Sequence, residues 1–222
     1  MAVRRSPRMK RTTAAGEAIA GLGLLGCATY VGLVFVHRPA LNGLDRFAFR
    51  QLPSSGVHHP LLLRMLLLTG SPAVVVIAVG CAFAIGCLSD LRRAIACVMG
   101  SGLAIVITQN IGKPLVAANV AGFGGHSYPS GSVTAVAAYV AALILVAPRS
   151  FRPTMISGGV AIVSAVSGAV IAARWHFATD ALGGALVGVG TLLFFDGLLH
   201  LLKIRHLAMI RTPSESEPEI AG

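Results

Sequence analysis

Long apolar runs dominate this chain and restrict it to the few architectures that a membrane permits. Of its 222 residues, 55% are hydrophobic and 12% are charged, whereas a soluble domain carries about 25% charged residues. A run of about 20 apolar residues is long enough to cross a bilayer as a helix. Because lipid offers no partners for free backbone groups, such runs fold as helices. The sequence therefore predicts an all-α, polytopic membrane protein.

Six apolar runs predict a bundle of six transmembrane helices. They cover residues 18–36, 61–88, 94–111, 133–147, 155–173 and 181–202. Residues 70–72, Gly-Ser-Pro, interrupt the second run. That run is either one kinked helix or a short interfacial segment followed by a helix. Apolar residues also recur at helical spacing over 41–52, which predicts an amphipathic helix in the membrane interface.

The charges predict how the bundle is oriented in a cell membrane. We expect one membrane domain over 16–204, a basic tail over 1–15 and a polar, acidic tail over 205–222. With both termini in the cytoplasm, the inner segments carry 12 of the 18 Lys and Arg residues and the outer segments carry six. Positive residues favour the cytoplasmic side, so this orientation is predicted.

The net charge of +10 does not indicate a nucleic-acid partner. The basic residues lie at the ends of the apolar runs and in the N-terminal segment, where they set topology and contact anionic membrane lipids. The four cysteines fall within apolar runs and match no metal-binding spacing. We expect free thiols and no metal site.

Two polar segments interrupt the apolar sequence on the predicted outer side, at 128–132 and 175–180. In the second, His176 and Asp180 are four residues apart and share one face of a helix. A carboxylate that accepts from one imidazole nitrogen leaves the other nitrogen available as a base or nucleophile. The alternative is that Asp180 only caps the last helix while His176 lies at the lipid interface.

The first polar segment has the chemistry of an anion site. Pro129 suits the start of a helix, and the following Ser130 and Gly131 leave backbone N–H groups exposed at its positive end. Lys113 ends the third apolar run on the same side and could neutralise a phosphate. An ordinary helix start and an interfacial lysine are the simpler alternatives.

The order of these elements resembles that of the type-2 phosphatidic acid phosphatase family, which shares its helical fold with the vanadium haloperoxidases. The shared elements are a lysine ending helix three, Pro-Ser-Gly opening helix four, and His-x3-Asp between helices five and six. The resemblance covers most of residues 40–200. It includes Leu44-Asp45-Arg46 and the Gly183-Gly184 pair after the aspartate.

The resemblance implies a lipid phosphatase that works through a phosphohistidine, without a metal or other cofactor. His176 would be the nucleophile and Asp180 its orienting partner, while Lys113, Ser130 and Gly131 would bind phosphate. The substrate would be a lipid phosphate or a polyprenyl diphosphate at the outer face of the membrane.

The chain departs from the family pattern at three places. Val120-Ala121 stands where the family has Arg-Pro, Ser132 stands where it has a histidine, and Val170 stands where it has an arginine. We expect Ser132 to contact the substrate beside Ser130 and Gly131. A diphosphate ester tolerates the loss of a general acid best, because its leaving phosphate needs less protonation.

Nearby residues could replace the missing groups. Arg174, two residues before His176, could contact the same phosphate, and His126, six residues before Ser132, could supply the acid. Arg174 could instead anchor the interface, and His126 could be a solvated loop residue.

Two other functions remain open at this level. The departures are also compatible with a catalytically degenerate protein that binds phospholipid or a partner protein. Asp196 and His200, four residues apart near the inner end of the last run, could form the proton relay of a small transporter. A purely structural polar pair is the simpler interpretation of these two residues.

Overall fold

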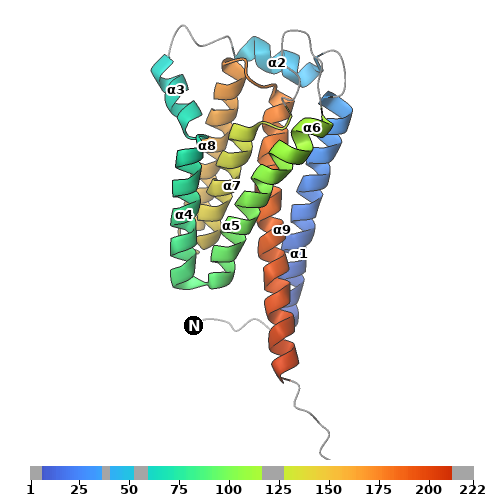
Figure 1. The fold of residues 1–222 in the computed structure, drawn as a ribbon, viewed down its shortest axis with the longest axis vertical. Coiled ribbons are helices and arrows are strands. Elements are labelled where there is room, and N and C mark those ends of the chain that lie inside the picture. The colour runs from blue at the N-terminus through green and yellow to red at the C-terminus, as the bar shows by residue number, and fades with distance from the viewer. Residues whose placement is uncertain (1–6, 37–40, 53–59, 117–127, 212–222) are drawn as a thin grey trace, which may run out of the picture.

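The computed structural model describes residues 7–36, 41–52, 60–116 and 128–211, and these fold as helices without any strand (Figure 1). The elements are α1 (Pro7–Val31), the π-helix η1 (Gly32–Val36), α2 (Gly43–Gln51), α3 (Pro60–Leu68), α4 (Pro72–Ser89), α5 (Leu91–Val106), the π-helix η3 (Ile107–Gly112), α6 (Lys113–Leu115), α7 (Gly131–Val146), α8 (Arg152–Ala172) and α9 (Ala178–Arg211).

Five of the described helices are long and apolar enough to cross a membrane. They cover Thr12–Val34, Pro72–Ser89, Leu91–Leu115, Arg152–Ala172 and Ala178–Lys203. This supports a multi-pass membrane protein, as the sequence predicted. The remaining apolar run forms α7, which at 16 residues is shorter.

The structure also resolves the alternatives for the interrupted second run. It is two helices, α3 and α4, separated by a turn in which the amides of residues 69–71 bond the carbonyls three residues before them. Pro72 begins α4, where its missing N–H costs no helical hydrogen bond. The amphipathic helix predicted over 41–52 is present as α2, which lies across one end of the bundle (Figure 1).

The terminal helices extend further than the sequence analysis predicted. α1 begins at Pro7, inside the predicted basic tail, and α9 continues to Arg211, inside the predicted C-terminal tail. Lys, Arg, Met and Leu are good helix formers, so a helix anchored in the bundle continues through such residues. Residues 7–15 and 205–211 of the two predicted tails are therefore helical.

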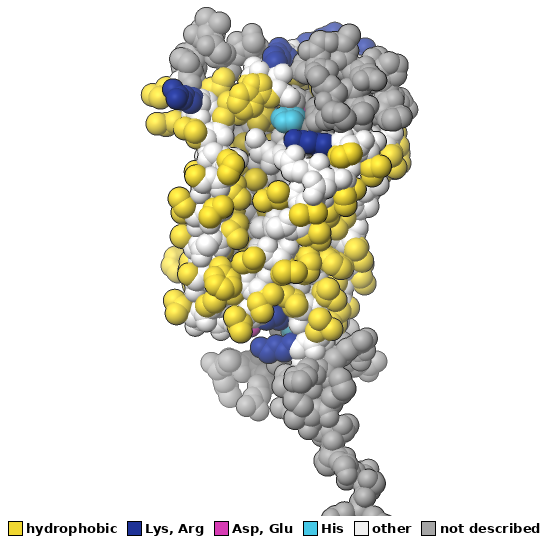
Figure 2. Space-filling view, viewed as in Figure 1, with side chains coloured by type: hydrophobic (Ala, Val, Ile, Leu, Met, Phe, Trp, Pro, Cys, Tyr) yellow, Lys and Arg dark blue, Asp and Glu magenta, His cyan; other side chains and the backbone are white. Residues whose placement is uncertain are grey.

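α7 forms the core of the bundle. Every residue from 133 to 140 is buried, as expected for a helix that is surrounded by others. The outer helices instead expose apolar side chains, such as Val76 and Ile77 of α4, which are 71% and 65% exposed. Hydrophobic side chains cover much of the face shown in Figure 2, which suits contact with lipid.

Glycines allow α7 and α9 to pack backbone against backbone. A Cβ atom added at Gly184 would lie 2.7 Å from the Ser130 carbonyl oxygen, and one added at Gly188 would lie 2.6 Å from the Thr134 carbonyl oxygen. These distances leave no room for a side chain, as in the small-residue packing common between membrane helices.

We expect Gly188→Ala to destabilise the protein, because its Cβ would meet the α7 backbone rather than a movable side chain. Overpacking of this kind costs about 1–3 kcal/mol in the free energy of unfolding. Thermal unfolding of the detergent-solubilised protein measures the effect. The matched control is Gly168→Ala on α8, where nothing lies within 4 Å of the added Cβ. Equal melting temperatures for the two variants would contradict the packing argument.

Candidate functional site

The two polar segments meet where α7 and α9 begin. The Ser130 amide donates a hydrogen bond of 3.0 Å to the Asp180 carbonyl oxygen, and both residues are fully buried. The absence of a side chain at Gly184 permits this approach. The structure therefore brings together the predicted anion-binding turn and the predicted His-Asp pair.

Asp180 performs both of the roles that the sequence left open. Its Oδ2 accepts a hydrogen bond of 3.0 Å from the Phe177 amide, immediately before α9, and lies 3.4 Å from Nδ1 of His176. The first contact caps the helix start in the manner of a capping box. The second orients the imidazole, whose side chain is 15% exposed. With Nδ1 as the donor, the lone pair of His176 is on Nε2.

Two polar atoms at this junction are buried and have no hydrogen-bond partner among the described residues. They are Oδ1 of Asp180 and Oγ of Ser130. Buried polar atoms almost always bond to protein or to ordered water. Two such atoms on adjoining helix starts therefore leave hydrogen-bonding capacity for a polar ligand or water.

The start of α7 also has cationic and amide groups close by. A Cβ atom added at Gly131 would lie 3.8 Å from Nζ of Lys113 and 3.1 Å from Nε2 of Gln109. The N-terminus of a helix attracts anions through its unbonded N–H groups and its dipole. Lys113, Gln109 and the Gly131 backbone together have the chemistry of a phosphate site. On the face shown in Figure 2, a histidine side chain lies beside a basic side chain near the α2 end.

The sequence analysis missed Gln109. It precedes Lys113 by four residues, so both fall on one side of the third membrane helix. That helical spacing was the signal that could have identified it.

Arg174 contacts α2 in this structure. Its guanidinium carbon lies 4.2 Å from the ring centroid of Phe49, and its Nη2 donates to the Phe49 carbonyl oxygen at 3.3 Å. A φ of 60° at Arg174 places its backbone in the left-handed region, which is uncommon for a residue with a side chain. Arg174 is thus observed to hold α2 against the start of α9, while an anchor in the membrane interface and a phosphate contact both stay predictions.

The remaining predicted site residues lie in different surroundings. Ser132 packs against the α3–α4 turn, since a Cβ atom added at Gly70 would lie 2.9 Å from the Ser132 Cβ. His126, the predicted acid, lies outside the described residues.

Asp45 connects α2 to the start of α9, a role that the sequence analysis did not assign. Its carboxylate accepts from the Thr179 amide at 3.0 Å and from the Thr179 hydroxyl at 3.1 Å and 3.2 Å. Asn42 caps α2 and donates to the other side of the same carboxylate at 2.6 Å. Thr179 immediately precedes Asp180. The contact with Asp45 therefore fixes the backbone next to Asp180, the residue that faces His176.

Burial changes the pKa of Asp45. Desolvation raises the pKa of Asp45 above its ordinary value of 3.8, the nearby Asp180 charge raises it further, and the hydrogen bonds from Thr179 oppose both effects. The sequence signal that could have identified it was an acid within the segment 41–52, whose other charged side chains are basic.

The polar residues at the opposite end do not form the predicted pair. Asp196 bonds to Arg92 at the start of α5, and His200 lies 3.9 Å from Glu17 of α1. Each residue therefore has its partner on another helix. Asp90 also lies 3.6 Å from Arg92.

Comparisons with known proteins identify no relative: no family model, curated protein or solved structure matches this chain. Within the described ranges, no group of three or more His, Cys, Asp or Glu residues is placed to hold a metal ion.

We expect Asp45→Ala to lower the free energy of unfolding by about 1–3 kcal/mol, because the Thr179 amide would lose its buried acceptor. Asp45→Asn keeps an acceptor oxygen and removes the charge, so it should cost less. Thermal unfolding in detergent compares the two variants. A larger loss in Asp45→Asn than in Asp45→Ala would contradict this role.

The same variants give a pH dependence with a defined sign. A raised pKa in the folded state means that the folded protein binds the Asp45 proton more tightly. This contribution to stability is fully present below the unfolded pKa and is lost as pH rises through the folded pKa. Relative to Asp45→Asn, the wild type should therefore be more stable near pH 4 than near neutral pH. The opposite slope would contradict the burial argument.

Proposed function

We propose that this protein is a membrane lipid phosphatase in which His176 attacks the phosphorus of a lipid phosphate or diphosphate. The observation that carries the proposal is the pair of unpartnered buried atoms, Ser130 Oγ and Asp180 Oδ1, where two helix starts adjoin. An oriented histidine, a helix N-terminus and Lys113 adjoin the same place. Nucleophile, partner carboxylate and anion site are the groups that such a reaction requires.

The proposal includes a bundle of six crossings, of the type found in the type-2 phosphatidic acid phosphatases. α7 would cross the membrane in addition to the five long apolar helices. It can be shorter because other helices surround it and lipid contacts little of it. Both termini would be cytoplasmic, in keeping with the distribution of Lys and Arg. The His176 site would then face outward.

In the first chemical step, Nε2 of His176 would form a bond to phosphorus as the bond from phosphorus to the leaving oxygen breaks. Asp180 would accept a hydrogen bond from Nδ1–H of His176 and stabilise the positive charge that forms on the imidazole, while the proton stays on Nδ1. Lys113 and the backbone N–H groups at the α7 start would bind the phosphoryl oxygens, where charge must be held in the transition state.

In the second step, a water molecule would attack the phosphohistidine and give one proton back to the group that had protonated the leaving oxygen. The N–P bond breaks, its electron pair returns to Nε2 of His176, and inorganic phosphate leaves.

In the first step, the leaving oxygen takes a proton from a general acid, for which His126 is the candidate from the sequence. Polyprenyl diphosphate fits best, because its leaving group is a phosphate that needs less protonation than an alkoxide.

α2 would admit the substrate from the outer leaflet. It lies across the end of the bundle that carries His176 (Figure 1), and exposes Leu44 and Phe47 as well as Arg46 and Arg50. Apolar and basic side chains on one interfacial helix suit a lipid with an anionic head group.

We expect phosphate release from lipid phosphates and diphosphates in detergent with EDTA, and its loss to background in His176→Ala. The matched control is His200→Ala at the opposite end of the bundle, which should retain release. With a substrate labelled in its phosphate, the enzyme should carry label that acid removes, as expected for a phosphohistidine. A phosphoserine or phosphothreonine ester would survive acid. The label should be absent from His176→Ala. Release that persists in His176→Ala would overturn the assigned nucleophile.

Two further variants test the orientation of His176 by Asp180 and the binding of phosphate by Lys113 separately. We expect Asp180→Asn to reduce kcat about 10²–10⁴-fold, as the loss of acid–base assistance does. Lys113→Gln should cost about 10²–10³-fold, as the loss of one charge-stabilising donor does. Arg64→Gln on α3, an exposed basic residue, is the control for charge alone. Equal losses in Lys113→Gln and Arg64→Gln would contradict a specific phosphate contact.

The second candidate is a protein that binds phospholipid without hydrolysing it. One observation favours it: Arg174, the nearest substitute for the missing arginines, packs on Phe49. This candidate predicts no phosphate release from folded protein with any substrate, together with a cellular role that survives His176→Ala.

A further inference from the structure

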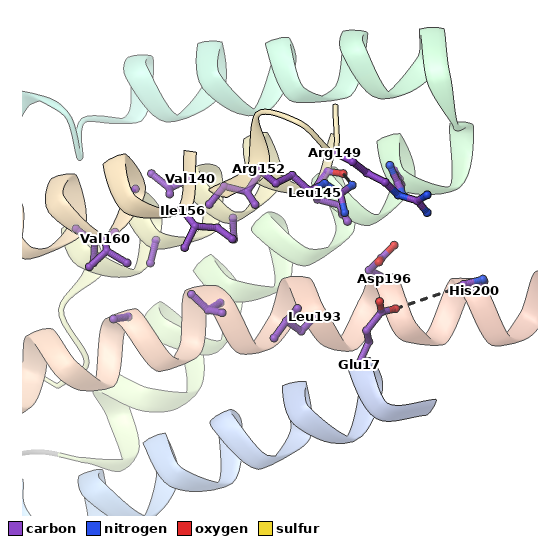
Figure 3. A pocket seen from close by; sticks show the side chains of 18 of the residues that line it. Glu17, Val140, Leu145, Arg149, Arg152, Ile156, Val160, Leu193, Asp196 and His200 are labelled. Carbon is purple, nitrogen blue, oxygen red and sulfur yellow. Dashed lines mark hydrogen bonds and ion pairs between the residues drawn. The ribbon is translucent and has the colours of Figure 1, made fainter. Parts of the chain in front are cut away.

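A large cavity lies between α7, α8 and α9 and opens toward the end of the bundle opposite His176. Its volume is about 1250 Å³, above the usual range of about 300–1,000 Å³ for small-molecule pockets. Figure 3 shows Val140, Ile156 and Val160 along one side and Leu193 on the facing α9. The shape is an apolar groove between helices, with a polar opening.

The apolar part of the groove is comparable in depth to one membrane leaflet. Along α9 the apolar lining extends from Ala185 to Leu193, a rise of about 12 Å, and Asp196, His200 and Lys203 continue it to the polar opening. Half of the hydrocarbon core of a bilayer is about 15 Å. Ile156 and Val160, which line it, are 50% and 62% exposed, so the groove is accessible from the side where lipid would lie.

The opening is cationic. Five basic and three acidic side chains line it, which leaves a net charge of +2 with His200 neutral. Arg152 is fixed by hydrogen bonds to the carbonyl oxygens of Leu145 at 2.8 Å and Ala147 at 3.2 Å. Arg93 and Arg149 lie within electrostatic range of Arg152. Figure 3 shows Arg149 and Asp196 toward the same end of the cavity.

In the part of the chain that the structure describes, the acidic side chains form no ion pair with Arg93, Arg149 or Arg152. Asp90 and Asp196 contact Arg92, and Glu17 lies beside His200. Among the described residues, no carboxylate lies within ion-pair distance of Arg93 or Arg149. The Nε of Arg93 is buried and has no hydrogen-bond partner within that part of the chain. An external anion would supply the missing partner.

We propose that this groove is a binding site for an anionic phospholipid. One acyl chain lies along α7, α8 and α9, and the phosphate lies at Arg93, Arg149 and Arg152. Guanidinium groups bind phosphate oxygens through charge-assisted, bidentate hydrogen bonds. The apolar length of the groove selects a lipid over a free phosphate, which would leave that surface unfilled. The site shares no residue with the His176 site, so it does not depend on the proposed phosphatase activity.

A tryptophan reporter tests the site directly. The chain has a single tryptophan, Trp175, which is exposed at the other end and is replaced by Phe. Ile156→Trp then reports from the groove and Val76→Trp reports from the outer surface of α4. The protein is reconstituted with brominated phosphatidylglycerol or brominated phosphatidylcholine at equal mole fraction, and quenching of the tryptophan fluorescence is measured.

We expect stronger quenching of the Ile156→Trp reporter by phosphatidylglycerol, and equal quenching of the Val76→Trp reporter by both lipids. Arg93→Gln with Arg149→Gln should lower the relative affinity for phosphatidylglycerol on the order of tenfold or more, as the loss of two surface cations implies. Arg64→Gln on α3, an exposed basic residue to which no lipid contact is assigned, should leave it unchanged.

Equal quenching of the Ile156→Trp reporter by the two lipids would overturn the proposal, as would a preference that survives Arg93→Gln with Arg149→Gln. Melting temperatures show whether each variant is folded. If Ile156→Trp does not fold, Val160→Trp gives a second reporter on the same side of the groove, read by the same two criteria.

Discussion

The direct contact between the starts of α7 and α9 is the constraint on which the candidate site depends. The Ser130 amide bonds the Asp180 carbonyl at 3.0 Å, and Gly184 and Gly188 leave the space that this approach requires. Two helix N-termini are thereby held side by side in a low-dielectric interior. At the α9 start the Phe177 and Thr179 amides already bond the carboxylates of Asp180 and Asp45. The N–H groups and dipole of the α7 start are therefore the ones that would bind an anion, more strongly there than in water.

The contact also explains why α2 packs where it does. Holding Asp180 at the bundle end places Thr179 against Asp45, and the carboxylate fixes α2 across that end. Phe49 then packs on Phe177, with ring centroids 5.6 Å apart, and against Arg174. A chain of contacts thus runs from the core helix α7 to an interfacial helix. The opposite end is organised by ion pairs around Arg92 instead, so the two ends have different chemistry.

Much of the fold could be predicted from the sequence, because apolar length alone selects membrane helices. The break at Gly70-Ser71-Pro72, the helix α2 and the start of α7 near Ser130 followed from local residue chemistry. The partners of Asp45, Asp196 and His200 could not be predicted, since each bonds a residue on a different helix. Local spacing suggested the pair Asp196–His200, but the packing of α9 against α1 and α5 gave each residue a closer partner.

The most direct test of the central claim is an experimental structure with bound orthovanadate, a phosphate analogue. The account predicts vanadate at the α7 start, with oxygens near the Gly131 N–H and Lys113 Nζ and with Nε2 of His176 directed at vanadium. Oδ2 of Asp180 should remain on Nδ1 of the same histidine. Vanadate bound elsewhere, or His176 turned away from the α7 start with vanadate present, would contradict the claim that the joined helix starts form a phosphoryl-transfer site.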